Sequence, residues 1–215
     1  RCLAGKEWIN STAGAWIRPV SARSSHEISE EERRYDNGHT AQIFDIISIP
    51  CERHEPVSHQ QENHLIDPEY HWTKKGRLSW NDIHQFIDNP DNLWGLGEGS
   101  YAGINNRVAV GQEDGTSLYL ISVPRLTLLV GRKAPEYPDS KRAVRGEFVY
   151  RNQTYRMDVT DPVIEQEYLN RADGSYNVEQ PVLCVSLGDP YQASGATQSY
   201  YYKLVAAILY RERFE

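Results

Sequence analysis

Apolar and polar residues alternate most regularly between Phe148 and Asp161. Residues 148–150 are aromatic or β-branched, and residues 151–154 are polar. The apolar side chains at positions 155, 157 and 159 then alternate with polar ones. A period of two is typical of a strand with one buried face. Two such segments around a short polar link predict a β-hairpin.

The second half of the chain extends this pattern on both sides of the hairpin. Asp161 and Pro162 predict the start of a helix over 163–170, because Asp caps free backbone N–H groups and Pro suits the first helical position. Further strands are expected at residues 117–123, 126–130, 145–150, 155–160, 182–187 and 201–210. About six short strands with one helix between two of them outline a small Greek-key barrel of the OB type.

The first half has fewer clear strands. Residues 6–10 and 15–20 predict two strands joined by a turn, and the almost continuous apolar run 42–50 predicts a strand buried on both faces. Ser79, followed by an apolar stripe, predicts a helix over 79–87. Long loops are expected at residues 51–67 and 94–106.

The expected fold class is therefore all-β with a few short helices, built as two OB-like barrels in tandem. The first half is interpreted as a decorated second barrel, although no internal repeat is visible. Residues 111–116 are polar and flanked by glycine, which favours a junction there. The expected domains are residues 1–111 and 112–215.

Charge is unevenly distributed along the chain. The formal net charge is −7, and all of it falls on residues 1–115. The segment from Arg125 to Arg156, by contrast, carries eight basic residues against three acidic ones. An acidic chain argues against indiscriminate nucleic-acid binding, whereas a local basic segment is compatible with a focused site.

This basic segment supplies the first candidate site. Single-stranded nucleic acid is bound by cations for the phosphates and aromatic rings for the bases. The candidates for phosphate contacts are Arg132, Lys133, Lys141, Arg142 and Arg145. The candidates for stacking are Tyr137, Tyr150 and the pair Trp16 and Arg18. The alternative is a solvated loop with aromatic residues in the core, and a cation–π contact for Trp16 and Arg18.

The polar segment after residue 51 supplies the second candidate site. Its candidates for ligand contacts are His59, Gln60, Glu62 and Asn63. Their side chains offer paired donors and acceptors, but they could equally satisfy backbone groups of a folded loop. Cys51, His54, His59 and His64 do not have a recognised zinc spacing, so neither a metal nor a cofactor is expected. No nucleophile, phosphate-loop or metalloprotease motif is visible, so no catalytic residue is assigned.

Several short motifs resemble the dual OB-containing domain family of bacteria. They span almost the whole chain: Arg1–Gly5, Trp16–Ser21, His59–Asn63, Gly76–Trp80, Val159–Pro162, Val185–Gly188 and Tyr202–Ala207. The resemblance implies two tandem OB-like barrels and a nucleic-acid-binding role, often within larger prokaryotic systems. It implies no catalytic activity, and it suggests that a first strand precedes Arg1.

The leading functional hypothesis is a non-enzymatic module that binds nucleic acid, with single strands favoured, or a nucleotide. It would belong to a larger prokaryotic system, such as one for defence or for DNA or RNA processing. The alternatives are a protein–protein adaptor and a hydrolase acting on nucleotide or nucleic acid through His59, Glu62 and Asn63. Three scattered cysteines indicate free thiols in a reducing cytoplasm. The sequence contains no apolar run long enough to cross a membrane.

Overall fold

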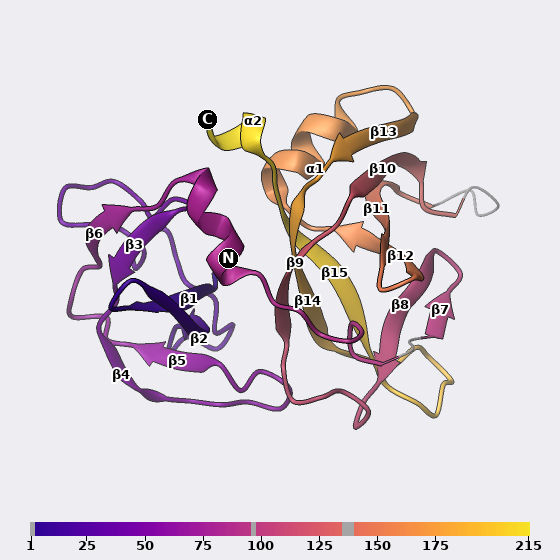
Figure 1. Ribbon diagram of the computed structural model, residues 1–215. Helices are drawn as coiled ribbons and strands as arrows, with labels where there is room; N and C mark the ends of the chain where they lie inside the picture. The colour runs from indigo at the N-terminus through magenta and orange to yellow at the C-terminus, as the bar shows by residue number, and fades with distance from the viewer. Residues whose placement is uncertain (1–2, 96–97, 135–139) are drawn as a thin grey trace. The chain divides into compact units, whose positions relative to one another are not determined.

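The computed structural model describes residues 3–95, 98–134 and 140–215 (Figure 1). The chain forms two compact units. The first comprises Arg1–Phe86 with Gly115–Ser117, and the second comprises Ile87–Asp114 with Leu118–Glu215. Strands dominate both units, which confirms the expected all-β class.

The second unit is one sheet of nine strands with two helices. Its strands are β7 (Glu98–Ser100), β8 (Gly103–Ala109), β9 (Leu118–Ser122), β10 (Arg125–Arg132), β11 (Arg142–Tyr150), β12 (Gln153–Val159), β13 (Gly174–Glu179), β14 (Val182–Tyr191) and β15 (Tyr200–Leu209). Its helices are α1 (Pro162–Leu169) and α2 (Arg211–Phe214).

Strands β11 and β12 form the predicted hairpin. Phe148 lies opposite Tyr155, and Tyr150 lies opposite Gln153. The connecting residues Arg151 and Asn152 both have positive φ, 49° and 62°. Two consecutive left-handed residues are the signature of a type I′ turn, whose twist matches that of the flanking strands.

The hairpin belongs to a closed circuit of strands. β9 pairs with β14, and β10 pairs with β13. The two ladders are joined by backbone hydrogen bonds from Val123 N to Pro181 O (3.2 Å) and from Gln180 N to Pro124 O (2.9 Å). β14 pairs with β15, and β15 runs parallel to β12. The sheet therefore closes into a barrel. Its first strand is β9 with β10, its second and third are β11 and β12, its fourth is β13 with β14, and its fifth is β15. Helix α1 lies between the third and fourth strands along the chain, as in an OB barrel.

Strand β8 widens this barrel between β12 and β15. Its residues pair with Arg156 of β12 and with Tyr200–Tyr202 of β15. The expected domain junction at residues 111–112 does not coincide with the division between the units, because these pairings place β8 in the second unit. Residues 94–106, expected as a loop, accordingly contain β7 and the first part of β8.

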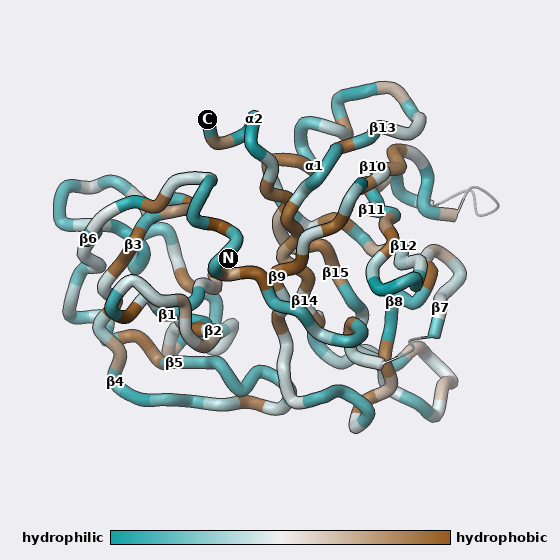
Figure 2. The backbone as a smooth tube through the Cα atoms, viewed as in Figure 1, coloured by the Kyte–Doolittle hydropathy of each residue, from teal (hydrophilic) through white to brown (hydrophobic). Residues whose placement is uncertain are grey.

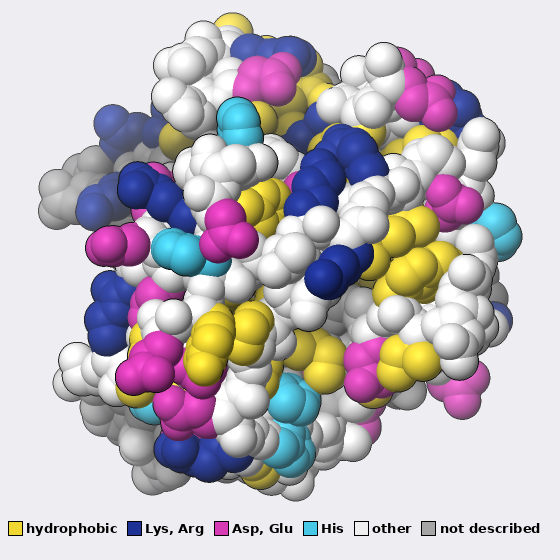
Figure 3. Space-filling view, turned by 90° about the vertical axis from the view of Figure 1, so that its left-hand side faces the viewer, with side chains coloured by type: hydrophobic (Ala, Val, Ile, Leu, Met, Phe, Trp, Pro, Cys, Tyr) yellow, Lys and Arg dark blue, Asp and Glu magenta, His cyan; other side chains and the backbone are white. Residues whose placement is uncertain are grey.

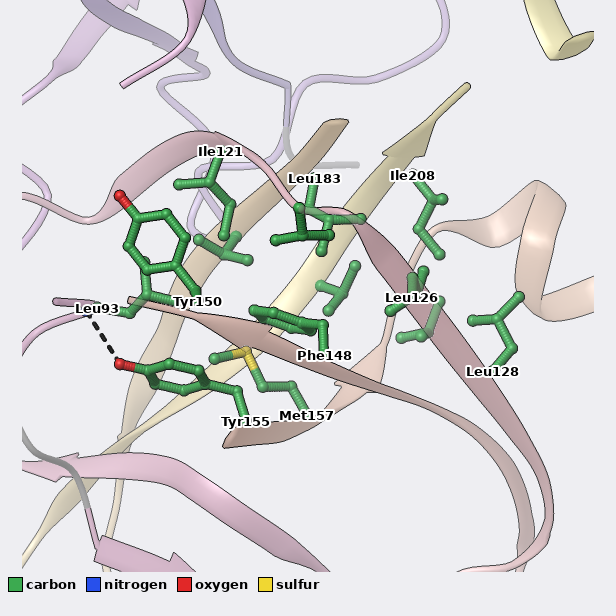
Figure 4. Close-up of a cluster of buried hydrophobic side chains, with 14 of the residues drawn as sticks. Leu93, Ile121, Leu126, Leu128, Phe148, Tyr150, Tyr155, Met157, Leu183 and Ile208 are labelled. Carbon is green, nitrogen blue, oxygen red and sulfur yellow. Dashed lines mark hydrogen bonds between the residues drawn. The ribbon is translucent and has the colours of Figure 1, made fainter. Parts of the chain in front are cut away.

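The core of the second unit is formed by the inward faces of these strands. Leu126, Leu128 and Val205 are completely buried, and the rings of Phe148 and Tyr155 stack with centroids 5.6 Å apart. Figure 4 shows both rings beside Met157. Hydrophobic stretches of the unit gather in the strands around β9 and β15 (Figure 2). The loops add Leu93 and Trp94, both with no exposed surface.

Helix α1 begins as the sequence predicts. The Asp161 carboxylate accepts hydrogen bonds from Val163 N (3.1 Å) and Ile164 N (3.3 Å), and Pro162 opens the first turn. The same carboxylate accepts from Ile208 N and from the Arg213 guanidinium at 2.6 Å. The cap therefore also joins the helix to the C-terminal strand and to α2.

The first unit contains two smaller sheets. One has the order β1 (Gly5–Ile9), β2 (Thr12–Val20), β5 (Asn63–Ile66) and β4 (Cys51–His54), and the other pairs β3 (Asp45–Ser48) with β6 (Thr73–Arg77). A cluster of Ile28, Tyr35, Ile66 and Trp72 forms its core.

Two expectations for the first unit are corrected, and the helix expected over residues 79–87 is present in a tighter form. Residues 51–67 are not one loop, since β4 and β5 pair within them and β5 buries Leu65 and Ile66. The run 42–50 yields only the four-residue strand β3, which is partly exposed rather than buried on both faces. Residues Trp80–Phe86 form a 3₁₀ helix, η1, rather than an α-helix. Its first turn is tightened by a bond from Asp82 N to Ser79 O.

None of the helices among the described residues is long and apolar enough to cross a membrane.

Candidate nucleic-acid interface

The predicted phosphate contacts are mostly occupied by internal partners. The Lys133 ammonium forms an ion pair with Asp158. The Arg145 guanidinium donates to the backbone oxygens of Ala102 (3.2 Å) and Lys133 (3.3 Å). Burial, followed by the neighbouring charge of Arg156, lowers the pKa of Arg145. On the same sheet face, Arg156 pairs with Glu147 at 2.6 Å. This face therefore carries little uncompensated positive charge.

Arg142 has a structural role at the end of α1. Its guanidinium donates to the backbone oxygens of Leu169 and Arg171 and pairs with Asp173 at 2.7 Å. A cation at these carbonyl groups satisfies the free acceptors of a helix C-terminus. Arg142 therefore braces the α1–β13 connection.

The remaining basic candidates flank the loop between β10 and β11. Arg132 is the last residue of β10, and Lys141 is exposed just before β11. Tyr137, the stacking candidate in this loop, lies outside the described residues.

The stacking role predicted for Tyr150 is corrected by the structure. The ring is 8% exposed and belongs to the core, and its hydroxyl donates to Pro90 O at 2.7 Å. A ring packed in this way presents no open face to a base. Trp16 in the first unit is half-buried, with Lys6 Nζ 5.3 Å from its ring centroid.

Residues from three separate segments meet at Arg18. Its Nε bonds to Glu62 Oε1 at 2.8 Å, and its Nη2 donates to Ser117 Oγ at 2.8 Å. The Ser117 hydroxyl donates to the same Glu62 oxygen. The side chains of Arg18 and Glu62 are each only 8% exposed. This ion pair joins β2, the turn before β5 and the segment 115–117, so each charge has a compensating partner inside the fold.

The other candidates of this segment lie in the turn before β5 and at its first residue, Asn63. Val57 and Gln60 exchange backbone hydrogen bonds, and the Asn63 amide donates to Gln60 Oε1 at 3.2 Å. His59 and Asn63 are 3% and 4% exposed. Burial of this degree supports the alternative in which the loop folds back on itself. Within the described part of the chain, no group of three or more His, Cys, Asp or Glu residues is arranged to hold a metal.

An aromatic surface that the sequence analysis did not assign lies across β14, β15 and β8. The rings of Tyr191 and Tyr202 meet edge to face, with centroids 6.2 Å apart, and Tyr191 is 57% exposed. On the neighbouring strand, the Arg107 guanidinium lies over the Tyr200 ring at 4.1 Å. We call Tyr191, Tyr200, Tyr202 and Arg107 the tyrosine face.

The sheet register explains why these side chains share one surface. Tyr191 lies opposite Tyr200, and Tyr202 lies opposite Arg107. Positions 200 and 202 point outward, whereas Tyr201 and Lys203 point into the core. Glu98 accepts a hydrogen bond from Tyr200, which raises the pKa of that phenol, and it also pairs with Arg107 at 3.1 Å. These contacts fix the orientation of Arg107 and Tyr200.

One signal in the sequence points to this surface. The run Tyr200-Tyr201-Tyr202 lies in a predicted strand, where alternate residues face opposite sides. Two of its three rings must therefore share a face. The sequence does not predict that Arg107 and Tyr191 join this surface, because they are brought to it by pairings between strands far apart in the sequence.

The comparisons with known proteins give one match. The model of the dual OB-containing domain family matches residues 1–208, so the chain belongs to this family. No curated protein and no solved structure matches it.

Proposed function

We propose that this member of the dual OB-containing domain family binds single-stranded nucleic acid on the tyrosine face of its second unit. The observation that carries the proposal is the cluster of partly exposed rings with a stacked guanidinium on an OB-type barrel. OB barrels bind oligonucleotides on the face of their second and third strands and with the loops after their first and fourth strands. In this barrel those loops are residues 133–141 and 192–199, and the second joins Tyr191 to Tyr200. The tyrosine face adjoins the second of these loops rather than the face of β11 and β12.

Single strands suit this surface better than duplexes. Every base has a flat face that stacks on a tyrosine or an arginine, whereas a duplex keeps those faces within its own stack. Stacking contributes about 1–3 kcal/mol per base and tolerates different sequences. The tyrosine face therefore favours binding with little sequence preference.

Internal ion pairing limits the phosphate contribution. Lys133, Arg156 and Arg107 already face carboxylates. Lys141, which is exposed just before β11, is therefore the main candidate for a phosphate contact. The slope of log K against log salt grows with the number of phosphates neutralised. We expect a shallow slope, equivalent to about one or two phosphates.

The test is a fluorescence-anisotropy titration with labelled single- and double-stranded DNA and RNA at two salt concentrations. Micromolar or tighter binding to a single strand, at least tenfold weaker for the duplex, is the expected result. Equal affinity for both forms, together with a steep salt slope, would replace stacking with a purely electrostatic contact. Absence of binding at low salt would contradict the proposal. The adaptor hypothesis would then be favoured, with the tyrosine face binding a protein.

The proposed binding role also indicates in what kind of system and compartment the protein works. A binding module without an assigned catalytic group fits a subunit of a larger prokaryotic system that processes or senses nucleic acid. Cys51 and Cys184 are free thiols, which supports a reducing compartment such as the bacterial cytoplasm.

A further inference from the structure

A pocket of about 380 Å³ lies in the first unit, between the segment 35–45 and strand β6. Its lining residues are Tyr35, Asn37, His39, Thr40, Gln42, Asp45 and Lys74. The volume falls within the range that holds small-molecule ligands. None of these residues takes part in the tyrosine face.

The Asp45 carboxylate organises the pocket. Its side chain is only 1% exposed, and both of its oxygens are used. Oδ2 accepts from the Tyr35 hydroxyl at 2.9 Å and from Gln42 N at 3.2 Å. Oδ1 accepts from Lys74 Nζ at 2.6 Å and from Arg77 Nη1 at 3.0 Å. These contacts lower the pKa of Asp45 despite its burial, so the carboxylate stays ionised.

Two cations therefore share one carboxylate, which leaves one positive charge in excess. The side chains of Lys74 and Arg77 remain 42% and 47% exposed. Each uses only part of its donor capacity on Asp45, because an ammonium has three N–H donors and a guanidinium has five. The remaining donors are available to a ligand that carries negative charge.

An irregularity in β6 places both cations on the same side. Residues three apart on a regular strand point to opposite faces. Here Gly76 lies opposite Ile46 and Lys74 lies opposite Ile47, so the register skips Lys75. Such an extra residue in one strand redirects the side chains beyond it. As a result, Lys74 and Arg77 both reach Asp45, although they are three positions apart.

The residue before Asp45 is also held in an uncommon conformation. Phe44 has a φ of 73°, which is rare for a bulky side chain. Leu78 N donates to Phe44 O at 2.8 Å, and the Phe44 ring meets Trp80 edge-on with centroids 6.3 Å apart. Strain of this kind persists only where its surroundings impose it, and it gathers at functional sites.

We infer that this pocket binds a phosphate monoester, of the kind that a nucleotide carries. Lys74, which lines the pocket, would hold the phosphate with its unused donors. Arg77 does not line the pocket, but it shares Asp45 with Lys74 and so adds positive charge beside it.

Asn37 Oδ1 accepts from His39 N, and Gln42 Nε2 donates to Thr40. The amide N–H groups of Asn37 and the amide oxygen of Gln42 therefore serve the rest of the ligand. Two sources share this chemistry, namely a free mononucleotide and the phosphorylated end of an oligonucleotide.

Figure 3 shows the face that lies on the left in Figure 1, where basic, acidic and histidine side chains are interspersed. In such a mixed surface a general attraction of anions is weak. Selectivity for phosphate must come from directed donors such as those of Lys74.

The test is isothermal titration calorimetry of the 215-residue chain with adenosine 5′-monophosphate, adenosine and inorganic phosphate. The nucleotide is expected to bind at least tenfold more tightly than the nucleoside. Lys74→Gln should weaken nucleotide binding at least tenfold, whereas the neighbouring Lys75→Gln should leave it unchanged. Equal binding of nucleotide and nucleoside, or equal effects of the two variants, would overturn the inference.

Two further arms complete the test. If Lys74→Gln fails to fold, as judged by its thermal melt, Gln42→Ala replaces it, since that side chain is exposed. A threefold or larger loss of nucleotide affinity supports the pocket, and no loss overturns it.

Oligonucleotides with and without a 5′-phosphate, assayed on a variant lacking Tyr191 and Tyr202, distinguish the two sources of the phosphate. Because the pocket and the tyrosine face carry different variants, either proposal can fail alone.

Discussion

Lys203 is a buried amine in the core of the second unit. Its side chain is 1% exposed, and Nζ has no hydrogen-bond partner within the described residues. Nζ lies over the Tyr155 ring, 5.7 Å from its centroid. Burial lowers the pKa of Lys203 from 10.5 to about 8. A charge at this position therefore opposes folding.

The pH dependence follows from the direction of this shift. Below about pH 8 the amine is protonated in both the folded and unfolded states, so the full penalty is present. Above that pH the folded state binds fewer protons than the unfolded state, and stability rises. We expect Lys203→Met to raise the free energy of unfolding at pH 7 by on the order of 3 kcal/mol.

Urea denaturation of both proteins at pH 7 and pH 9 checks this expectation. The difference between variant and wild type should shrink at the higher pH, because the wild-type amine is then largely neutral in the fold. Because the two proteins are compared at each pH, the contributions of all groups that titrate alike in both of them cancel. A difference that stays constant with pH would show that the charge of Lys203 is not the cause.

Arg18 and Glu62 give a second test at the residue scale. Glu62→Gln removes one charge and leaves the other buried, which typically costs about 3–5 kcal/mol. Urea denaturation should show this loss, while Glu52→Gln, at an exposed pair with Arg53, should change stability by less than about 1 kcal/mol. A stable Glu62→Gln protein with lost turnover on a nucleotide would revive the hydrolase hypothesis.

At the scale of elements, local signals identified the strands and turns of the second unit. Alternation marked β11, β12 and β15, and Asp161 with Pro162 marked the start of α1. These signals act within a few residues, so a sequence displays them directly. The insertion of β8 between β12 and β15 depends on pairings across about 50 and 95 residues, which no local pattern encodes.

Strand β4 and the ion pairs of the basic segment were not predicted, for related reasons. All four residues of β4 are exposed, so its sequence looks like a loop. The basic residues around β11 were identified, but not the carboxylates that neutralise them. Glu147 lies opposite Arg156 only because β11 and β12 pair in this register. Lys133 follows β10 and reaches Asp158 of β12 across β11, which pairs with both strands.

The turn between β11 and β12 offers a test of the hairpin. Asn152 has a φ of 62°, a conformation that glycine adopts at lower cost. Asn152→Gly should therefore raise the free energy of unfolding by a few tenths to about 1 kcal/mol, whereas Asn152→Ala should lower it. Thermal denaturation of both variants decides the matter, and destabilisation by glycine would contradict the assigned turn.

At the scale of the whole molecule, the two units carry different candidate chemistries. The second presents rings for stacking on an OB-type barrel, and the first presents a pocket with paired cations. Each feature arises from an addition to a simple barrel or sheet, namely the inserted β8 and the irregular register of β6. A chain with both could bind a nucleic-acid strand and a phosphorylated group independently.

The most direct test of the central claim removes the rings. Fluorescence anisotropy would compare the wild type with a Tyr191→Ala, Tyr202→Ala double variant on one labelled single-stranded oligonucleotide. Tyr70→Ala serves as the control, because this ring is 61% exposed but lies in the first unit. We predict at least a tenfold loss of affinity for the double variant and none for the control. Unchanged affinity in a folded double variant would contradict stacking on the tyrosine face.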